Sequence, residues 1–314
     1  LVGVYLGSFV VRILMRQREL VPFEGVQGAL ALLVGFGGAL RVAQASGSGD
    51  AVLAVAALLG GFACYGAAFA FVEKQAGHSG NFTFFTSLAL VLVATGCFVL
   101  IGGAGRTWAF AGLGLTTTLL GLRFGRWTLL AHGSAYLSTA ALVSELAARS
   151  LEAFLAADRA RTPATAPALV ALAALALVHG LLSRGGETRR WPERLPSLAA
   201  GAWAALGAGA LLVDALGRLL PGQPPEPAAL AAVRTAVLAG SAATLAALAR
   251  RWPGSELRWL VYPLLGLAGL KRGISDLALG RPLTLFPSLA AIGAALILAP
   301  RLLRAQAEKV DAKE

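Results

Sequence analysis

The feature that most constrains this chain is its repeated apolar segments, each about as long as a bilayer is thick. The last one contains no charged side chain between Leu283 and Pro300. A helix rises about 1.5 Å per residue, so about 20 apolar residues cross the hydrocarbon core. We therefore expect an all-α polytopic transmembrane bundle of about ten spanning helices. The expected spans are 25–46, 51–72, 82–103, 107–122, 127–148, 166–183, 196–217, 228–249, 258–279 and 283–303.

Composition agrees with lipid as the main solvent. The 314 residues are 57% hydrophobic and 14% charged, whereas soluble domains carry about 25% charged residues. The alternation typical of strands is absent, and Ala, Leu and Gly dominate. Small residues let membrane helices approach closely, and the string Gly201, Ala205, Gly209 predicts one such packing face.

The net charge of +11 does not indicate a nucleic-acid partner. The basic residues occur singly or in pairs between apolar segments, not in patches interleaved with aromatic residues. That distribution is the one that fixes membrane orientation. If loop 12–24 is cytoplasmic, strict alternation puts most lysines and arginines in the cytoplasm, and only connection 149–161 disagrees. We therefore expect a cytoplasmic C-terminus.

Two long connections, 149–165 and 184–195, organise the chain. We expect a truncated or interfacial segment at 1–24, a five-helix group at 25–149, a connection at 150–165, a second five-helix group at 166–304 and a polar tail at 305–314. If the groups are structural repeats, an odd number of spans makes them inverted relative to each other, as in many transporters. Because the halves do not align by residue, coincidence is the alternative.

Ionisable side chains inside the apolar segments are the candidates for a polar site. Each costs about 2.5–3.5 kcal/mol at the bilayer centre on insertion scales. The candidates are His132, Asp214, Arg234, Lys271, Arg272 and Asp276.

Spacing suggests how these charges could pair. Arg272 and Asp276 are four residues apart and can pair on one helical face. Lys271 points about 100° away, and Asp214 could be its partner, with Arg234 competing. Such pairs either join helices or form a polar site for an ion, a proton or an anionic headgroup.

The histidines and the missing motifs bear on chemistry. His132 lies in a polar span, where it makes a helix–helix hydrogen bond or lines a substrate path, and His179 is expected at the membrane interface. The chain contains no P-loop, HExxH, CxxC or GxSxG motif. We therefore expect no metal, no cofactor and no enzyme activity.

The C-terminal hairpin, residues 257–304, carries a resemblance. Its pattern LAGLKRGISDL…GRPLTLFPSLAAIGAALILAPRLLR resembles the closing segment of a family of bacterial polytopic membrane proteins of unknown function. The matching positions are Lys271, Asp276, Arg281, Phe286 and Gly293. The resemblance implies a bacterial inner-membrane location and no established activity.

Two functions remain open from the sequence. The first is a multi-pass protein with a structural or envelope-associated role, in contact with the lipid bilayer and with other membrane proteins or a second copy. The second is a secondary transporter or lipid-substrate handler, similar in span count to the drug/metabolite transporter superfamily, with Asp214, Lys271 and Asp276 lining the path of an unidentified small molecule. A transporter predicts a polar cavity at mid-depth, whereas a structural protein predicts a dry bundle with its charges paired.

Overall fold

The computed structural model describes residues 11, 21–72, 79–155, 165–183, 191–220, 226–252, 256–273 and 282–311. Every regular element in these ranges is helical. The chain forms two compact units, Leu1–Phe110 and Ala111–Glu314. The predicted division at 150–165 rests on connection length and stays a prediction.

Within its described residues, the first unit contains three long apolar helices. These are the continuous helix of α2 (Pro22–Ala31), η1 (Leu32–Phe36) and α3 (Gly37–Ser46), the helix of α4 (Asp50–Ala67) and η2 (Ala68–Val72), and α5 (Ser79–Leu100). They match the predicted spans 25–46, 51–72 and 82–103 to within a few residues.

Glycines set the close packing of α4 on α5. A Cβ added at Gly61 would lie 2.6 Å from the side chain of Val93, and one at Gly96 would lie 2.6 Å from that of Leu58. A larger side chain at either glycine would push the helices apart. The contact is therefore of the small-residue type expected between membrane helices.

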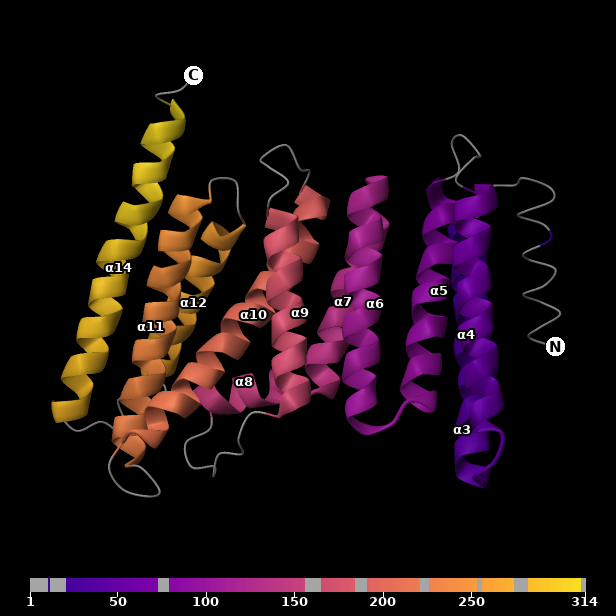
Figure 1. Ribbon diagram of the computed structural model, residues 1–314, viewed down its shortest axis with the longest axis horizontal. Coiled ribbons are helices and arrows are strands. Elements are labelled where there is room, and N and C mark those ends of the chain that lie inside the picture. The colour runs from indigo at the N-terminus through magenta and orange to yellow at the C-terminus, as the bar shows by residue number, and fades with distance from the viewer. Residues whose placement is uncertain are drawn as a thin grey trace. The chain divides into compact units, whose positions relative to one another are not determined.

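The second unit runs from the end of α6 to α14 (Figure 1). Its elements are the end of α6 (Gly103–Phe124), α7 (Trp127–Val143), α8 (Leu146–Leu155), α9 (Ala166–Ser183), α10 (Trp191–Arg218), α11 (Pro227–Arg251), α12 (Leu257–Lys271) and α14 (Pro282–Asp311). Helix α11 packs against α10, α12 and α14. Their shared core includes Val213, Leu238, Val261 and Leu265.

Seven helices in the described ranges are long and apolar enough to cross a membrane. They are Phe23–Ser46, Asp50–Ala70, Gly80–Leu100, Ala166–Ser183, Arg194–Arg218, Pro227–Arg251 and Thr284–Arg304. The expected count of about ten is not confirmed. The predicted span 107–122 lies within α6, which is not among the seven. Helices α7 and α12 have 17 and 15 residues and are shorter than a typical span of about 20 residues. The predicted span 258–279 continues into residues outside the described ranges.

The prediction of one span over 127–148 is wrong at its C-terminal end. Helix α7 ends at Val143, and the chain turns at Ser144 and Glu145. The φ angle of Glu145 is 63°. The Ser144 hydroxyl donates to the Ala141 carbonyl and accepts from the Leu146 N–H, which favours the turn over a continued helix. Apolarity alone did not reveal this stop.

Helix α8 then runs across the long axes of α9 and α10 instead of prolonging α7 (Figure 1). One face, including Leu146 and Phe154, is buried, while Leu151 and Leu155 on another face are exposed. It also packs against α10. A short amphipathic helix of this kind is typical of a membrane interface.

The outer surface is apolar. Leu33, Val52 and Phe286 are each more than 70% exposed, which a water-soluble protein would not repeat over so many helices. Exposed tryptophans stand near helix ends, as expected of an aromatic belt: Trp108, Trp127, Trp252 and Trp259. With the seven apolar helices, this surface indicates a membrane protein in contact with lipid.

Candidate functional site

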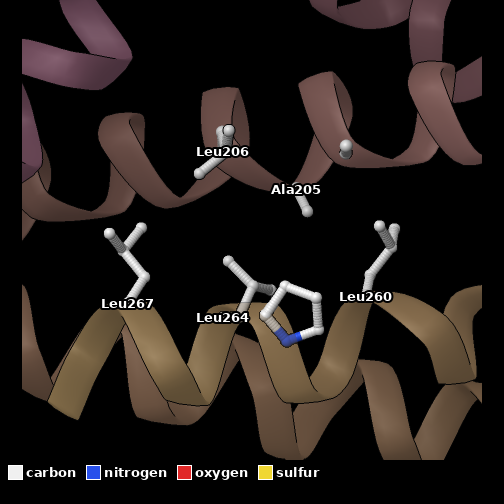
Figure 2. Close-up of a pocket in the computed structure, with 7 residues that line it drawn as sticks. Ala205, Leu206, Leu260, Leu264 and Leu267 are labelled. Atoms are coloured by element: carbon white, nitrogen blue, oxygen red, sulfur yellow. The ribbon is translucent and has the colours of Figure 1, made fainter. Parts of the chain in front are cut away.

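An apolar groove lies between α10 and α12. Ala205 and Leu206 of α10 point toward Leu260, Leu264 and Leu267 of α12 across it (Figure 2). Its volume is about 160 Å³. All of its lining residues are apolar, so it offers dispersion contacts and no side-chain hydrogen bonds.

Along α12, the face that lines the groove has a charged residue before it and another after it. Leu260, Leu264 and Leu267 recur at helical spacing and share one face. Glu256 stands four residues before Leu260, and Lys271 stands four residues after Leu267. Both charged residues are buried, with 4% and 6% of their surface exposed. The groove therefore has an acidic end and a basic end.

At the basic end, Lys271 reaches across to the first turns of α11. Its Nζ donates to the Ala231 carbonyl oxygen at 3.4 Å and to Thr235 Oγ1 at 3.3 Å. Arg234, the residue before Thr235, is also buried. The start of α11 and the end of α12 thus bring two of the predicted cations into one region.

Arg272 lies about 100° around α12 from Lys271 and faces α14. Its guanidinium donates to Ser288 Oγ and, at 3.3 Å, to the Leu285 carbonyl oxygen. The side chain is buried, and its Nε has no hydrogen-bond partner within the described part of the chain. Its hydrogen-bonding partners there are neutral oxygens.

At the acidic end, three helices meet in a chain of hydrogen bonds. Ser197 Oγ of α10 donates to Glu256 Oε2 at 2.9 Å. His179 Nδ1 of α9 lies 2.9 Å from the Ser197 carbonyl oxygen and 3.3 Å from Ser197 Oγ. Because a carbonyl oxygen can only accept, the shorter contact places a proton on Nδ1.

Gly201 makes room for this network. A Cβ at that position would lie 2.8 Å from His179 Nδ1 and 3.2 Å from the Leu260 side chain. The predicted packing role of Gly201 therefore serves a specific purpose: it lets the imidazole lie against the backbone of α10.

The structure brings some of the sequence-predicted residues together and not others. Arg234, Lys271 and Arg272 are all buried where α11 begins and α12 ends. Asp214 is half-buried on α10, and Asp276 lies outside the described residues. The proposed Arg272–Asp276 and Lys271–Asp214 pairs stay predictions.

His132 is buried on α7, which packs against α9 and α10, whereas the three cations lie on α11 and α12. A shared site that includes His132 stays a prediction. Within the described ranges, no group of three or more His, Cys, Asp or Glu side chains could hold a metal ion.

Sequence reasoning missed Ser197 and Glu256 and placed His179 only at the interface. His179 is near the end of α9 as expected, but its ring is half-buried and hydrogen-bonded to α10. Glu256 and Ser197 are 59 residues apart, and no local pattern links them. The one available signal was an acid directly before an apolar helix.

Comparisons with protein-family models, with curated proteins and with solved structures found no match. None of them supports the resemblance of residues 257–304 to a bacterial membrane-protein family.

Proposed function

We propose that this membrane protein is a lipid handler that binds an anionic lipid between α10 and α12. An acyl-chain segment occupies the groove, and the anionic headgroup approaches Lys271. One observation carries the proposal. The leucines of α12 that line the groove share one helical face with buried Lys271, which lies one turn beyond Leu267.

The size and lining of the groove favour an alkyl chain over a polar solute. Small-molecule sites usually measure about 300–1,000 Å³ and include a few polar groups. This groove has about 160 Å³ and only apolar lining residues. It suits several methylene groups, while the rest of the lipid remains against the outer surface of the helices.

Charge complementarity supports an anionic headgroup. Lys271 carries a buried positive charge at this end of α12, where its Nζ donates to the Ala231 carbonyl oxygen and to Thr235 Oγ1. Buried Arg234 adds positive charge on the adjacent turn of α11. Basic residues between membrane helices are suited to acidic lipid headgroups.

The experiment is to count lipids that stay bound to the full chain. The protein is reconstituted with phosphatidylglycerol and phosphatidylcholine, extracted in mild detergent and examined by native mass spectrometry. Lys271→Gln should weaken phosphatidylglycerol retention about tenfold, because a hydrogen bond to a charged group contributes about 1.5–3 kcal/mol. Arg258→Gln, which changes an exposed arginine of the same helix, is the matched control.

A second pair of variants tests the tail. Ala205→Phe should fill the groove and displace lipid of both headgroup classes, whereas Ala208→Phe, at an exposed position one turn along α10, should not. If both phenylalanine variants and both glutamine variants retain lipid like the unchanged protein, the lipid proposal is wrong and a purely structural role is left.

A further inference from the structure

The acidic end of the groove contains a carboxyl group and an imidazole joined through one hydroxyl. Glu256 and Ser197 are buried, with 4% and 0% of their surface exposed. His179, Ser197 and Glu256 come from three different elements, α9, α10 and the residue that precedes α12. None of the three lines the groove between α10 and α12.

The carboxylate of Glu256 has few donors. The residue occupies the N-cap position of α12, yet its side chain does not bond to that helix. Within the described residues, its one side-chain hydrogen bond comes from Ser197. The carboxyl group of Glu256 is therefore buried and bonded mainly through the Ser197 hydroxyl.

His179 supplies a second proton-binding group in direct contact. Its Nδ1 faces Ser197, and its Nε2 is buried with no hydrogen-bond partner in the described part of the chain. The imidazole therefore has one nitrogen engaged with the network and a second, buried nitrogen that can carry the other proton.

We propose that His179, Ser197 and Glu256 form a proton-binding site in which the Ser197 hydroxyl passes a proton between the imidazole and the carboxylate. In one direction, Ser197 Oγ gives its proton to Glu256 Oε2 and takes the Nδ1 proton of the imidazolium. The ion pair thereby becomes a neutral imidazole and a carboxylic acid, with no atom gained or lost. The reverse transfer restores the charges.

The geometry points to proton exchange rather than to nucleophilic catalysis by Ser197. A nucleophilic serine needs an Oγ that a substrate can reach. Here Ser197 is fully buried, and its Oγ donates to Glu256 Oε2. The site therefore binds a proton without an attacking atom.

Other charged groups stand near this end of the packed elements. Helix α9 contains no charged residue besides His179, and α10 carries Glu193 and Arg194 about one turn before Ser197. Exposed Arg258 follows Glu256 on α12, and Arg250 and Arg251 are exposed at the end of α11. Arg194 is half-buried.

The test is infrared difference spectroscopy of the full chain in lipid nanodiscs, recorded between acidic and alkaline pH. We expect a carboxylic-acid C=O band that Glu256→Gln removes. Ser197→Ala should shift the frequency of this band, because the hydrogen bond to the carboxyl group is lost, and His179→Gln should change the pH at which it appears. Ser183→Ala, which removes a hydroxyl bonded only within the last turn of α9, should change neither.

Two results would overturn the proposal. One is a spectrum in which Glu256→Gln removes no band. The other is a band that responds to Ser197→Ala and His179→Gln no more than to Ser183→Ala. If Glu256→Gln does not fold, the unchanged protein labelled with ¹⁵N-histidine decides: the Nδ1 resonance of His179 must titrate together with the carboxyl band, and separate titrations contradict the exchange.

Discussion

The two ends of α12 hold their buried charged groups differently. At the N-terminal end, the carboxyl group of Glu256 accepts a hydrogen bond from one hydroxyl. At the C-terminal end, Lys271 and Arg272 donate to oxygens of α11 and α14. Glu256 depends on Ser197. Lys271 and Arg272 use the carbonyl oxygens of Ala231 and Leu285 as well as side-chain hydroxyls.

The difference follows from which backbone groups a helix leaves open. A carbonyl oxygen has two lone pairs, so it can accept from a cation while it stays in the helical ladder. Beyond the first turn, a helical N–H has one proton, which the ladder already uses, and Glu256 does not bond to the first turn of α12. Inside a bundle of membrane helices, acceptors for cations are therefore common and donors for carboxylates are scarce. The acidic end should be the more fragile of the two.

The largest effect should come from crowding the acidic end. Gly201→Val should cost about 3 kcal/mol of unfolding free energy, the upper end of the usual overpacking penalty, because its side chain would collide with His179 and Leu260. Gly266→Val, where nothing lies within 4 Å, should cost far less. Unfolding in mixed dodecyl maltoside and SDS micelles, followed by tryptophan fluorescence, measures both.

A smaller effect compares two serines, one at each end. Ser197→Ala leaves the Glu256 carboxylate without its side-chain donor and should cost about 1.5–3 kcal/mol. Ser288→Ala leaves Arg272 with the Leu285 carbonyl oxygen and should cost about 1 kcal/mol. Equal losses in the same unfolding assay would contradict the difference between the two ends.

The smallest effect should follow from Thr235→Val, which preserves shape and removes one of the two acceptors given above for Lys271. The Ala231 carbonyl oxygen remains, so the expected loss is about 0.5 kcal/mol, at the low end for a hydrogen bond. A loss as large as that of Ser197→Ala would show that Lys271 depends on one hydroxyl after all. The two variants are measured side by side.

Local pattern predicted much of the fold and part of the site. Seven of the predicted spans correspond to helices that are long and apolar enough to cross a membrane. Hydropathy located them because each spanning segment must itself be apolar over the thickness of the bilayer. The same reasoning selected Lys271, Arg272 and Arg234 as unusual, and all three are buried. It extended one span past Ser144 because the turn there depends on a single hydroxyl and a positive φ, which apolarity does not report.

The sequence by itself determined the class of this protein: a chain of apolar helices with an excess of basic residues and a few charges that lipid cannot solvate. Only the tertiary structure decided which of those charges share a region, and that His179, Ser197 and Glu256 meet at all. The physical reason is range. Segment length and helical period are local properties, whereas a hydrogen bond between α9, α10 and α12 exists only after particular helix faces have packed together.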